Sequence, residues 1–155
     1  MNRSTSRSAI SVVAASSIVT SELTVQTKGS GFVDVTAEVA AFVRDAAARE
    51  GSLNLFIRHT SASLTIQENA DPSVLVDLKT ALAWLAPEHA GWIHDTEGAD
   101  DMPAHVKTML TATSLQVPVM NGKLHLGTWQ AIYLVEHRAR PHHREIVLQF
   151  IGERD

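Results

Sequence analysis

The chain has 155 residues, of which 45% are hydrophobic and 19% are charged, and its formal net charge at neutral pH is −4. This length and composition are typical of one globular domain and exclude a disordered chain. The sequence has no Lys/Arg cluster and no apolar run of about 18 residues, so we expect neither a nucleic-acid partner nor a membrane. Because there are no cysteines, disulfides and thiolate chemistry are excluded, and the eight histidines favour imidazole-based sites.

The first 19 residues are rich in serine and alanine and contain arginines but no acid. Residues 9–19 could pass for a weak signal-peptide core, but serines interrupt it and no convincing cleavage site follows. We therefore predict a flexible N-terminal extension over residues 1–19, a folded domain over residues 20–155 and a cytoplasmic location.

The first part of this domain predicts short strands around one helix. Thr36 is expected to cap that helix, in which Val39, Phe42 and Val43 follow a helical period, and Gly51 is well placed to end it. Alternating apolar residues predict the strands. They cover residues 21–27, 32–35, 53–58 and 64–67.

Two further helices are expected in the middle of the chain. Asp71-Pro72 is a strong start, with aspartate as the cap and proline at the first helical position, and Pro87 stops this helix. A shorter helix is expected to begin at Pro103, with Asp101 or Met102 as its cap. The buried stripe predicted for the first of these helices comprises Val74, Leu75, Leu78, Leu82 and Leu85.

The C-terminal part is rich in strands. Asn121-Gly122 is a hairpin signal between strands expected over residues 115–119 and 123–126. Two long strands, 129–137 and 145–151, are expected to be joined by a short turn. Mixed strands and helices with short turns predict a single compact α+β domain with a mainly antiparallel sheet.

Residues 94–107 concentrate four acids and two histidines. Such a segment can bind a divalent cation, shuttle a proton or grip a cationic ligand, and it can equally be an acidic surface loop before a capped helix. It fails the calcium-loop pattern, because Val106 stands where a bidentate glutamate is required. The spacing of His94 and His105 matches no standard zinc motif, although a histidine site built from distant segments stays open.

Polar side chains also gather at the predicted ends of other elements. His59 precedes three hydroxyl residues where a strand ends, a place where rigid elements often aim functional groups, although it can simply satisfy its turn. Glu68 and Asn69 precede a helix start and can face a ligand or water. The helix starts at Asp71 and near Asp101 can bind an anion if they converge.

Six motifs occur in order along the chain. They are His59-Thr-Ser-Ala-Ser-Leu-Thr, Glu68-Asn69-x-Asp71-Pro72, Glu97-Gly-Ala-Asp-Asp-Met-Pro-x-His105-x-Lys107, Thr113-Ser114-Leu115, Gly127-Thr128-Trp129-Gln130 and Glu136-His137-Arg138. Together they resemble the YjbQ family of secondary thiamine-phosphate synthase enzymes, over residues 22–153. The resemblance implies an α+β domain that assembles as a homotrimer with a pocket near the subunit contacts. It also implies thiamine-phosphate synthase activity, which joins a pyrimidine methyl diphosphate to a thiazole phosphate and releases pyrophosphate.

The resemblance also implies, position by position, which residues form the pocket. The expected catalytic residues are His59, His105, Asp100 and Asp101. The expected substrate-binding residues are Glu68, Asn69, Asp71, Lys107, Thr128 and Gln130. Apart from the resemblance, a metal-dependent alternative places a metal at His59, His94 and His105, for which imidazole favours zinc whereas the neighbouring carboxylates favour magnesium.

Three hypotheses of function follow. The leading one is a small-molecule enzyme with thiamine-phosphate synthase activity, acting on a small phosphorylated metabolite. The second is a metal-dependent hydrolase that uses a histidine and carboxylate site. The third is a non-catalytic trimer that binds phosphometabolites, which uses the same residue types and so is not separated from the first by the sequence.

Overall fold

The computed structural model describes residues 5–155, and residues 1–4 of the predicted extension lie outside this range. Within it the chain forms eight strands and three helices. In chain order they are β1 (Ser17–Gln26), β2 (Gly31–Asp34), α1 (Thr36–Asp45), β3 (Ala48–Ile57), β4 (Ala62–Glu68), α2 (Pro72–Leu85), α3 (Asp101–Leu110), β5 (Ser114–Met120), β6 (Lys123–Leu124), β7 (Gln130–Glu136) and β8 (His143–Arg154).

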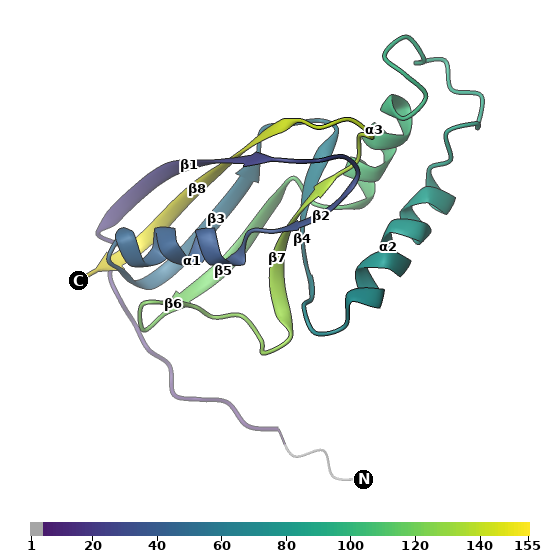
Figure 1. Ribbon diagram of the computed structural model, residues 1–155. Coiled ribbons are helices and arrows are strands. Elements are labelled where there is room, and N and C mark those ends of the chain that lie inside the picture. Colours follow the sequence, from purple (N-terminus) through teal and green to yellow (C-terminus); the bar gives the residue numbers. More distant parts are fainter. Residues whose placement is uncertain (1–4) are drawn as a thin grey trace.

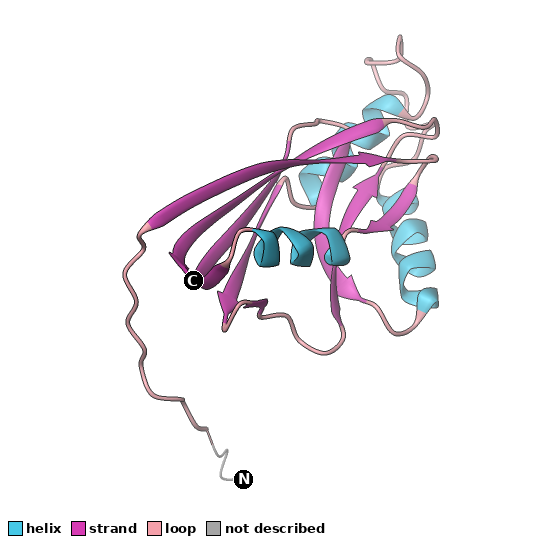
Figure 2. Cartoon of the chain, turned by 60° about the vertical axis from the view of Figure 1, so that its left-hand side comes forward, coloured by secondary structure: helices cyan, strands magenta, loops and turns pink. Residues whose placement is uncertain are grey.

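The strands form two sheets. The large sheet has the order β1-β8-β3-β5-β6 and the small sheet the order β2-β7-β4, and all strand pairs in the described part of the chain are antiparallel. Helix α1 lies across the large sheet (Figure 2), whereas α2 and α3 lie beyond the small sheet, on the side away from β1 (Figure 1). This arrangement confirms the predicted α+β domain with a mainly antiparallel sheet.

The apolar core fills the space between the two sheets and α1. Strand β8 alternates between buried and half-buried residues, so one face is turned to the core. Strand β7 is buried from Ala131 to Glu136, which explains its uninterrupted apolar run Ala131–Val135. The largest fully buried apolar side chains are Phe150, Leu53, Leu55, Ile57, Leu64, Ile132, Leu134 and Ile146, with Val35, Val39 and Val43 from the start and body of α1.

Two features expected of α1 are wrong. The Thr36 hydroxyl does not cap the helix but accepts a hydrogen bond from the Ile132 amide at 2.8 Å, and so links α1 to β7. The helix ends at Asp45, because the chain turns through Ala47, which has φ +48°, and enters β3.

Gly51 lies inside β3 rather than at a helix end. It stands opposite Gly152 of β8 and has φ +157°. A Cβ atom on Gly51 would overlap the Ile151 carbonyl, and one on Gly152 would overlap the Glu50 carbonyl. Both positions are therefore glycine because β3 and β8 approach closely beside a bulge in β3.

The predicted start of α2 at Asp71-Pro72 is confirmed, but the predicted buried stripe of this helix is not. The Asp71 carboxylate accepts a hydrogen bond from the Ser73 amide at 2.9 Å, with Pro72 at the first helical position. However, none of the residues of α2 is fully buried, and Leu85 is 64% exposed. Val74, Leu75, Leu78 and Leu82 are half-buried. Helix α2 lies at the outside of the fold (Figure 1).

Helix α3 begins two residues earlier than predicted. Asp100 is the N-cap residue without a side-chain capping bond, and Asp101 is the first helical residue. Pro103 is therefore the third helical residue, a position that proline tolerates because amides in the first turn have no partner within the helix. Arg138 engages both aspartates, so neither carboxylate is used as a cap.

The predicted strands are confirmed with shifted ends. Strand β1 begins at Ser17, opposite Gly152, so residues 17–19 of the predicted extension pair with β8. The last two long strands do not form a hairpin, because β7 belongs to the small sheet and β8 to the large one. None of the helices in the described range is long and apolar enough to span a bilayer, and the location of the chain stays a prediction.

Candidate functional site

The small sheet separates the predicted site residues into two groups. Strands β4 and β7 pair from Ala62–Glu136 at one end to Glu68–Gln130 at the other. Six steps of about 3.3 Å along the strand place these ends roughly 20 Å apart. One end carries His59, His94, Asp100, Asp101, His105 and Lys107, and the other carries Glu68, Asn69, Asp71, Thr128 and Gln130.

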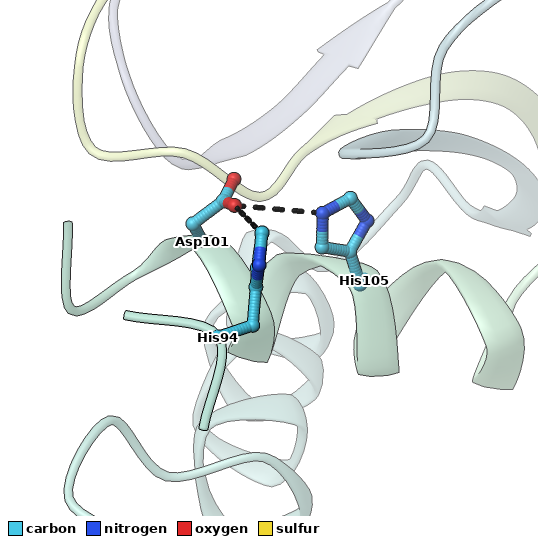
Figure 3. Close-up of side chains that lie close together, drawn as sticks. All are labelled: His94, Asp101 and His105. Atoms are coloured by element: carbon cyan, nitrogen blue, oxygen red, sulfur yellow. Dashed lines mark hydrogen bonds and ion pairs between the residues drawn. The ribbon is translucent and has the colours of Figure 1, made fainter. Parts of the chain in front are cut away.

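Three of the predicted residues converge at the start of α3. Both His94 and His105 point their Nε2 atoms at Oδ2 of Asp101, from distances of 2.8 and 3.5 Å (Figure 3). One ligand atom from each residue lies within 4.8 Å of the other two. The structure thus brings together two imidazoles and one carboxylate, a donor set typical of transition-metal sites.

Local structure places each of these side chains. Asp101 and His105 are four residues apart on α3 and therefore share one face of the helix. His94 comes from the long loop between α2 and α3, and its side chain is 47% exposed. The Asp101 side chain is only 3% exposed. The buried Asp101 carboxylate would be a fixed ligand for a metal ion, whereas the exposed His94 side chain can change its position when an ion binds.

Arg138, which follows β7, fixes the two aspartates. Its guanidinium donates to Oδ2 of Asp100 at 3.2 Å, to Oδ1 of Asp101, and to the Glu97 carbonyl at 2.8 Å. Burial alone would raise the pKa of Asp100, but the Ala139 amide and the Arg138 guanidinium outweigh burial and lower it. Asp100 therefore stays ionised and acts here as an anchor for the loop after β7.

The hydrogen bonds of His105 decide which of its ring nitrogens carries the proton. Nδ1 lies 3.0 Å from the Thr60 carbonyl, which can only accept, so Nδ1 donates. In the neutral ring Nε2 then carries a lone pair, and it faces the Asp101 carboxylate at 3.5 Å. This is the arrangement that metal-binding histidines use, with one nitrogen held by a carbonyl and the other free for the ion.

Two of the three separations in the group are close to those of a metal site. For bonds of about 2.0–2.2 Å at tetrahedral angles, two ligand atoms stand about 3.4 Å apart. The 3.5 Å between His105 and Asp101 already matches this value. The 2.8 Å between His94 and Asp101 has to open by roughly half an ångström, which the exposed loop of His94 permits.

His59 lies outside this group, although the sequence placed it there. Its Nε2 accepts the Glu145 amide at 2.8 Å, and its Nδ1 lies 3.5 Å from Nη1 of Arg144. Burial and, next, the Arg144 charge lower the pKa of His59. Its ring is therefore neutral and tied to β8, and in the structure Asp101 takes the third position expected of His59.

A buried ion pair behind His59 joins the two sheets. Arg144 of β8 donates to both carboxylate oxygens of Glu136 of β7, at 2.5 and 2.7 Å. Thr27 donates to the same carboxylate at 2.8 Å, and the Arg138 amide donates at 3.0 Å. Burial would raise the pKa of Glu136, but these donors outweigh it and lower the pKa. The pair fixes the segment that leads from β7 to Arg138.

Lys107 does not face the His94–Asp101–His105 group. It lines a separate cavity of about 160 Å³ between α2, α3 and the small sheet, together with His137. His137 is buried, and its Nε2 lies 2.8 Å from the Ser63 hydroxyl.

Two residues of the second predicted group, Glu68 and Gln130, line an open hollow of about 560 Å³ together with Trp129 and others. Several polar atoms of the second group already have partners. The Gln130 amide oxygen accepts the Gly127 amide at 2.8 Å, and the Asp71 carboxylate caps α2. Glu68 and Trp129 stay available to a ligand, and Trp129 is 65% exposed.

The sequence indicated that Glu136-His137-Arg138, with Arg144 across the turn, could be an ion-paired strand end, and the Glu136–Arg144 pair confirms this; none of the four was assigned to the site. The sequence signal for these residues is a charged or polar side chain at the end of, or within, a strand that is otherwise apolar. The run Glu136-His137-Arg138 was among the six motifs, but which partners it contacts depends on the fold.

Comparison with known proteins is consistent across sequence and structure. The family model described as "UPF0047 protein YjbQ-like" matches residues 21–153. The UPF0047 protein sll1880 of Synechocystis sp. is 48% identical over 84% of this chain and 90% of that protein, and UPF0047 protein YjbQ of Escherichia coli O157:H7 is 42% identical over 84% and 96%. A crystal structure of a YjbQ/UPF0047 family protein from Clostridium acetobutylicum is 36% identical, with a TM-score of 0.77 over 84% of this chain and 98% of that one.

Proposed function

The chain belongs to the UPF0047 family of YjbQ-like proteins, and on that premise we propose that it is a metal-dependent enzyme for a small phosphorylated metabolite. In this proposal His94, Asp101 and His105 hold a divalent transition metal. The family descriptions name no activity, so the argument for chemistry comes from the geometry of this chain.

The observation that supports the proposal most directly is the short distance between Nε2 of His105 and Oδ2 of Asp101. With Nδ1 of His105 donating to a carbonyl, two lone pairs face each other across 3.5 Å. Such a contact is favourable only with a cation between the atoms, either a proton or a metal ion. Because His94 adds a third ligand atom to the same space, a metal ion satisfies all three residues at once.

The donor set favours zinc, manganese or a related metal over magnesium. Imidazole nitrogen suits zinc and its neighbours, whereas magnesium takes oxygen ligands and keeps several waters. A bound metal would supply Lewis-acid chemistry, polarising a phosphoryl oxygen or a water molecule. Arg138 would keep Asp101 oriented, and Thr60 would keep the His105 ring oriented.

Two reactions fit this set of groups. Hydrolysis of a phosphate ester or anhydride is favoured by the histidine and carboxylate site, in line with the hydrolase hypothesis. Thiamine-phosphate synthase activity is the second candidate, supported by the resemblance and by two lysines, Lys79 and Lys107, that line a nearby cavity and could neutralise a departing pyrophosphate. A purely binding role predicts saturable ligand binding without turnover.

The test is metal analysis of the untagged protein together with a titration of the metal-free protein with Zn²⁺ and Co²⁺. Wild type should bind one ion per chain, and His105→Ala and Asp101→Asn should not. His125→Ala is the matched control, because His125 is exposed and lies in the loop after β6. Active protein that binds no metal would remove this proposal and favour proton transfer between His105 and Asp101.

We also propose that the chain assembles as the homotrimer that the resemblance implies. Support comes from apolar side chains on α2 and α3 that a single chain leaves open, including Trp84 at 79% and Met109 at 84% exposure. Light scattering on untagged protein should give about three times the chain mass of 16.8 kDa. A single-chain mass at micromolar concentration would contradict it.

A further inference from the structure

A cavity beside Lys107 carries chemistry that the metal group does not use. It lies between α2, α3 and the strands β2 and β7, and its volume of about 160 Å³ is roughly ten times what one water molecule requires. Its polar and charged lining comes from Ser30, Lys79, Glu88, Lys107, Glu136 and His137. These residues come from four separate parts of the chain, so the fold, and not one local motif, builds the cavity.

Lys107 enters this cavity without a partner. Within residues 5–155 its ammonium makes no ion pair within 4 Å and no hydrogen bond. The side chain is half-buried, and burial lowers its pKa, although the charges of Glu88 and Asp100 oppose that shift. A half-buried cation without a partner costs free energy, which an anion in the cavity would offset.

His137 offers a second group to the same space. Its Nε2 is occupied by the Ser63 hydroxyl, which in turn accepts from Thr111 at 2.7 Å. Ser63 can then donate to Nε2, which leaves the proton of the neutral ring on Nδ1. Within residues 5–155 Nδ1 makes no hydrogen bond, and no unpartnered side-chain nitrogen or oxygen is fully buried. Because His137 lines the cavity, we assign its Nδ1 proton as a donor for a ligand there.

The charges around the cavity favour an anion. Glu136 also lines it, but its carboxylate is fully engaged by Arg144, Thr27 and a backbone amide. Lys79 brings a second positive charge and donates to the Ser30 carbonyl at 2.9 Å. Two ammonium groups therefore stand against the one unengaged carboxylate of Glu88.

We propose that this cavity binds a phosphoryl group, held by Lys107, Lys79 and His137. A tetrahedral oxyanion has enough acceptors for both ammonium groups and the imidazole N–H. Glu88 also lines the hollow of about 320 Å³ that contains His94, so the cavity and the metal group open toward a common residue. That the phosphoryl group belongs to the enzyme's substrate rests on the proposed function, whereas the anion site rests on its own contacts.

The test uses inorganic phosphate as the probe and the full-length protein after treatment with EDTA, so that no metal contributes. Phosphate binding is measured by isothermal titration calorimetry, with acetate as the comparison anion. Lys107→Met keeps the aliphatic stem and removes the charge, and it should weaken phosphate binding at least about tenfold. The matched control is Lys123→Met, an exposed lysine on β6, which should leave binding unchanged.

A second variant guards against a folding defect in the first. Glu88→Gln removes the opposing carboxylate from an exposed position and should tighten phosphate binding several-fold. Absence of phosphate binding in wild type, equal binding by Lys107→Met, or equal binding of acetate would each overturn the proposal. Zn²⁺ binding is measured on the same variants and should not change, so failure of the phosphate site and failure of the metal site give different results.

Discussion

Glu136 and Arg144 form a bidentate, buried ion pair that joins the small sheet to the large one, with N–O distances of 2.5 and 2.7 Å. Both side chains are nearly inaccessible, at 0% and 5% exposure. The pair stands between strands that are consecutive in the chain but belong to different sheets. The pair therefore fixes the end of β7 relative to β8, and with it the position from which Arg138 contacts Asp100 and Asp101 at the start of α3.

Breaking this pair should destabilise the fold strongly. Glu136→Gln leaves the Arg144 guanidinium buried without a counter-charge, which costs about 3–5 kcal/mol of unfolding free energy. Glu22→Gln breaks the exposed pair with Arg58 and should cost less than about 1 kcal/mol. Urea unfolding at one fixed protein concentration measures both changes. Similar losses in the two variants would contradict the structural role given to Glu136.

The buried His137 should make the fold sensitive to acid. Burial, with the charges of Lys107 and Arg144 and against that of Glu136, lowers the pKa of His137 to about 4. In the unfolded chain a histidine has a pKa of about 6.5, so between these values only the unfolded state binds the proton. Stability is therefore lost as the pH falls below about 6.5, and the loss reaches about 3 kcal/mol near pH 4.

His137→Gln removes the ionisable group and keeps a polar contact for Ser63. Its unfolding free energy should fall less between about pH 7.5 and about pH 4.5 than that of wild type. Urea titrations at the two values measure the difference. An unchanged dependence on pH would mean that His137 has the same pKa in the folded and the unfolded protein, and would contradict this prediction.

Arg138 is expected to act on the metal group through Asp101 rather than by contact with the ion. Arg138→Met frees the second oxygen of Asp101 and should weaken Zn²⁺ binding by about 10–100-fold. Arg138→Lys should recover part of the loss, because an ammonium can reach one aspartate but not both. Competition with a chromogenic chelator measures the affinities, and thermal unfolding of each variant separates lost binding from lost folding.

The exposed side of α2 should control assembly and not the folding of one chain. Trp84 is 79% exposed and Leu85 is 64% exposed, so Trp84→Glu removes little packing within the chain. The variant should elute as a smaller species in chromatography with light scattering and keep its circular dichroism spectrum. Asp77→Lys changes charge at another exposed position of the same helix and serves as the control. Unchanged mass in Trp84→Glu would place the subunit contact elsewhere.

Local patterns in the sequence were enough to identify most of the elements but not their partners. The alternation in β8 and the Asp71-Pro72 start of α2 predicted those elements correctly, because each depends on residues within a few positions. Gly51 was misread as a helix end, since the need for glycine there comes from Gly152, about 100 residues away in the chain. Local sequence could not show that close approach of two strands.

The candidate site likewise has a part that local sequence predicted and a part that depends on tertiary contacts. The segment around His94, Asp101 and His105 was found from its density of ionisable groups, and the structure does bring these three together. His59 was expected in the metal site together with His94 and His105, but the Glu145 amide holds its ring. Which nitrogen of a histidine is free depends on tertiary contacts, and these are set by the pairing of β3 with β8.

The length of β4 predicts how substitutions at its two ends should combine. Because the Ala62 and Glu68 ends of β4 lie roughly 20 Å apart and the metal group lies beyond the Ala62 end, substitutions in the two groups should have additive effects on the stability of the chain. A metabolite of ordinary size cannot reach both ends of one subunit. If a ligand does touch both, they come from different copies, and a mixture of Glu68→Ala and His105→Ala subunits would then recover function that neither variant has alone.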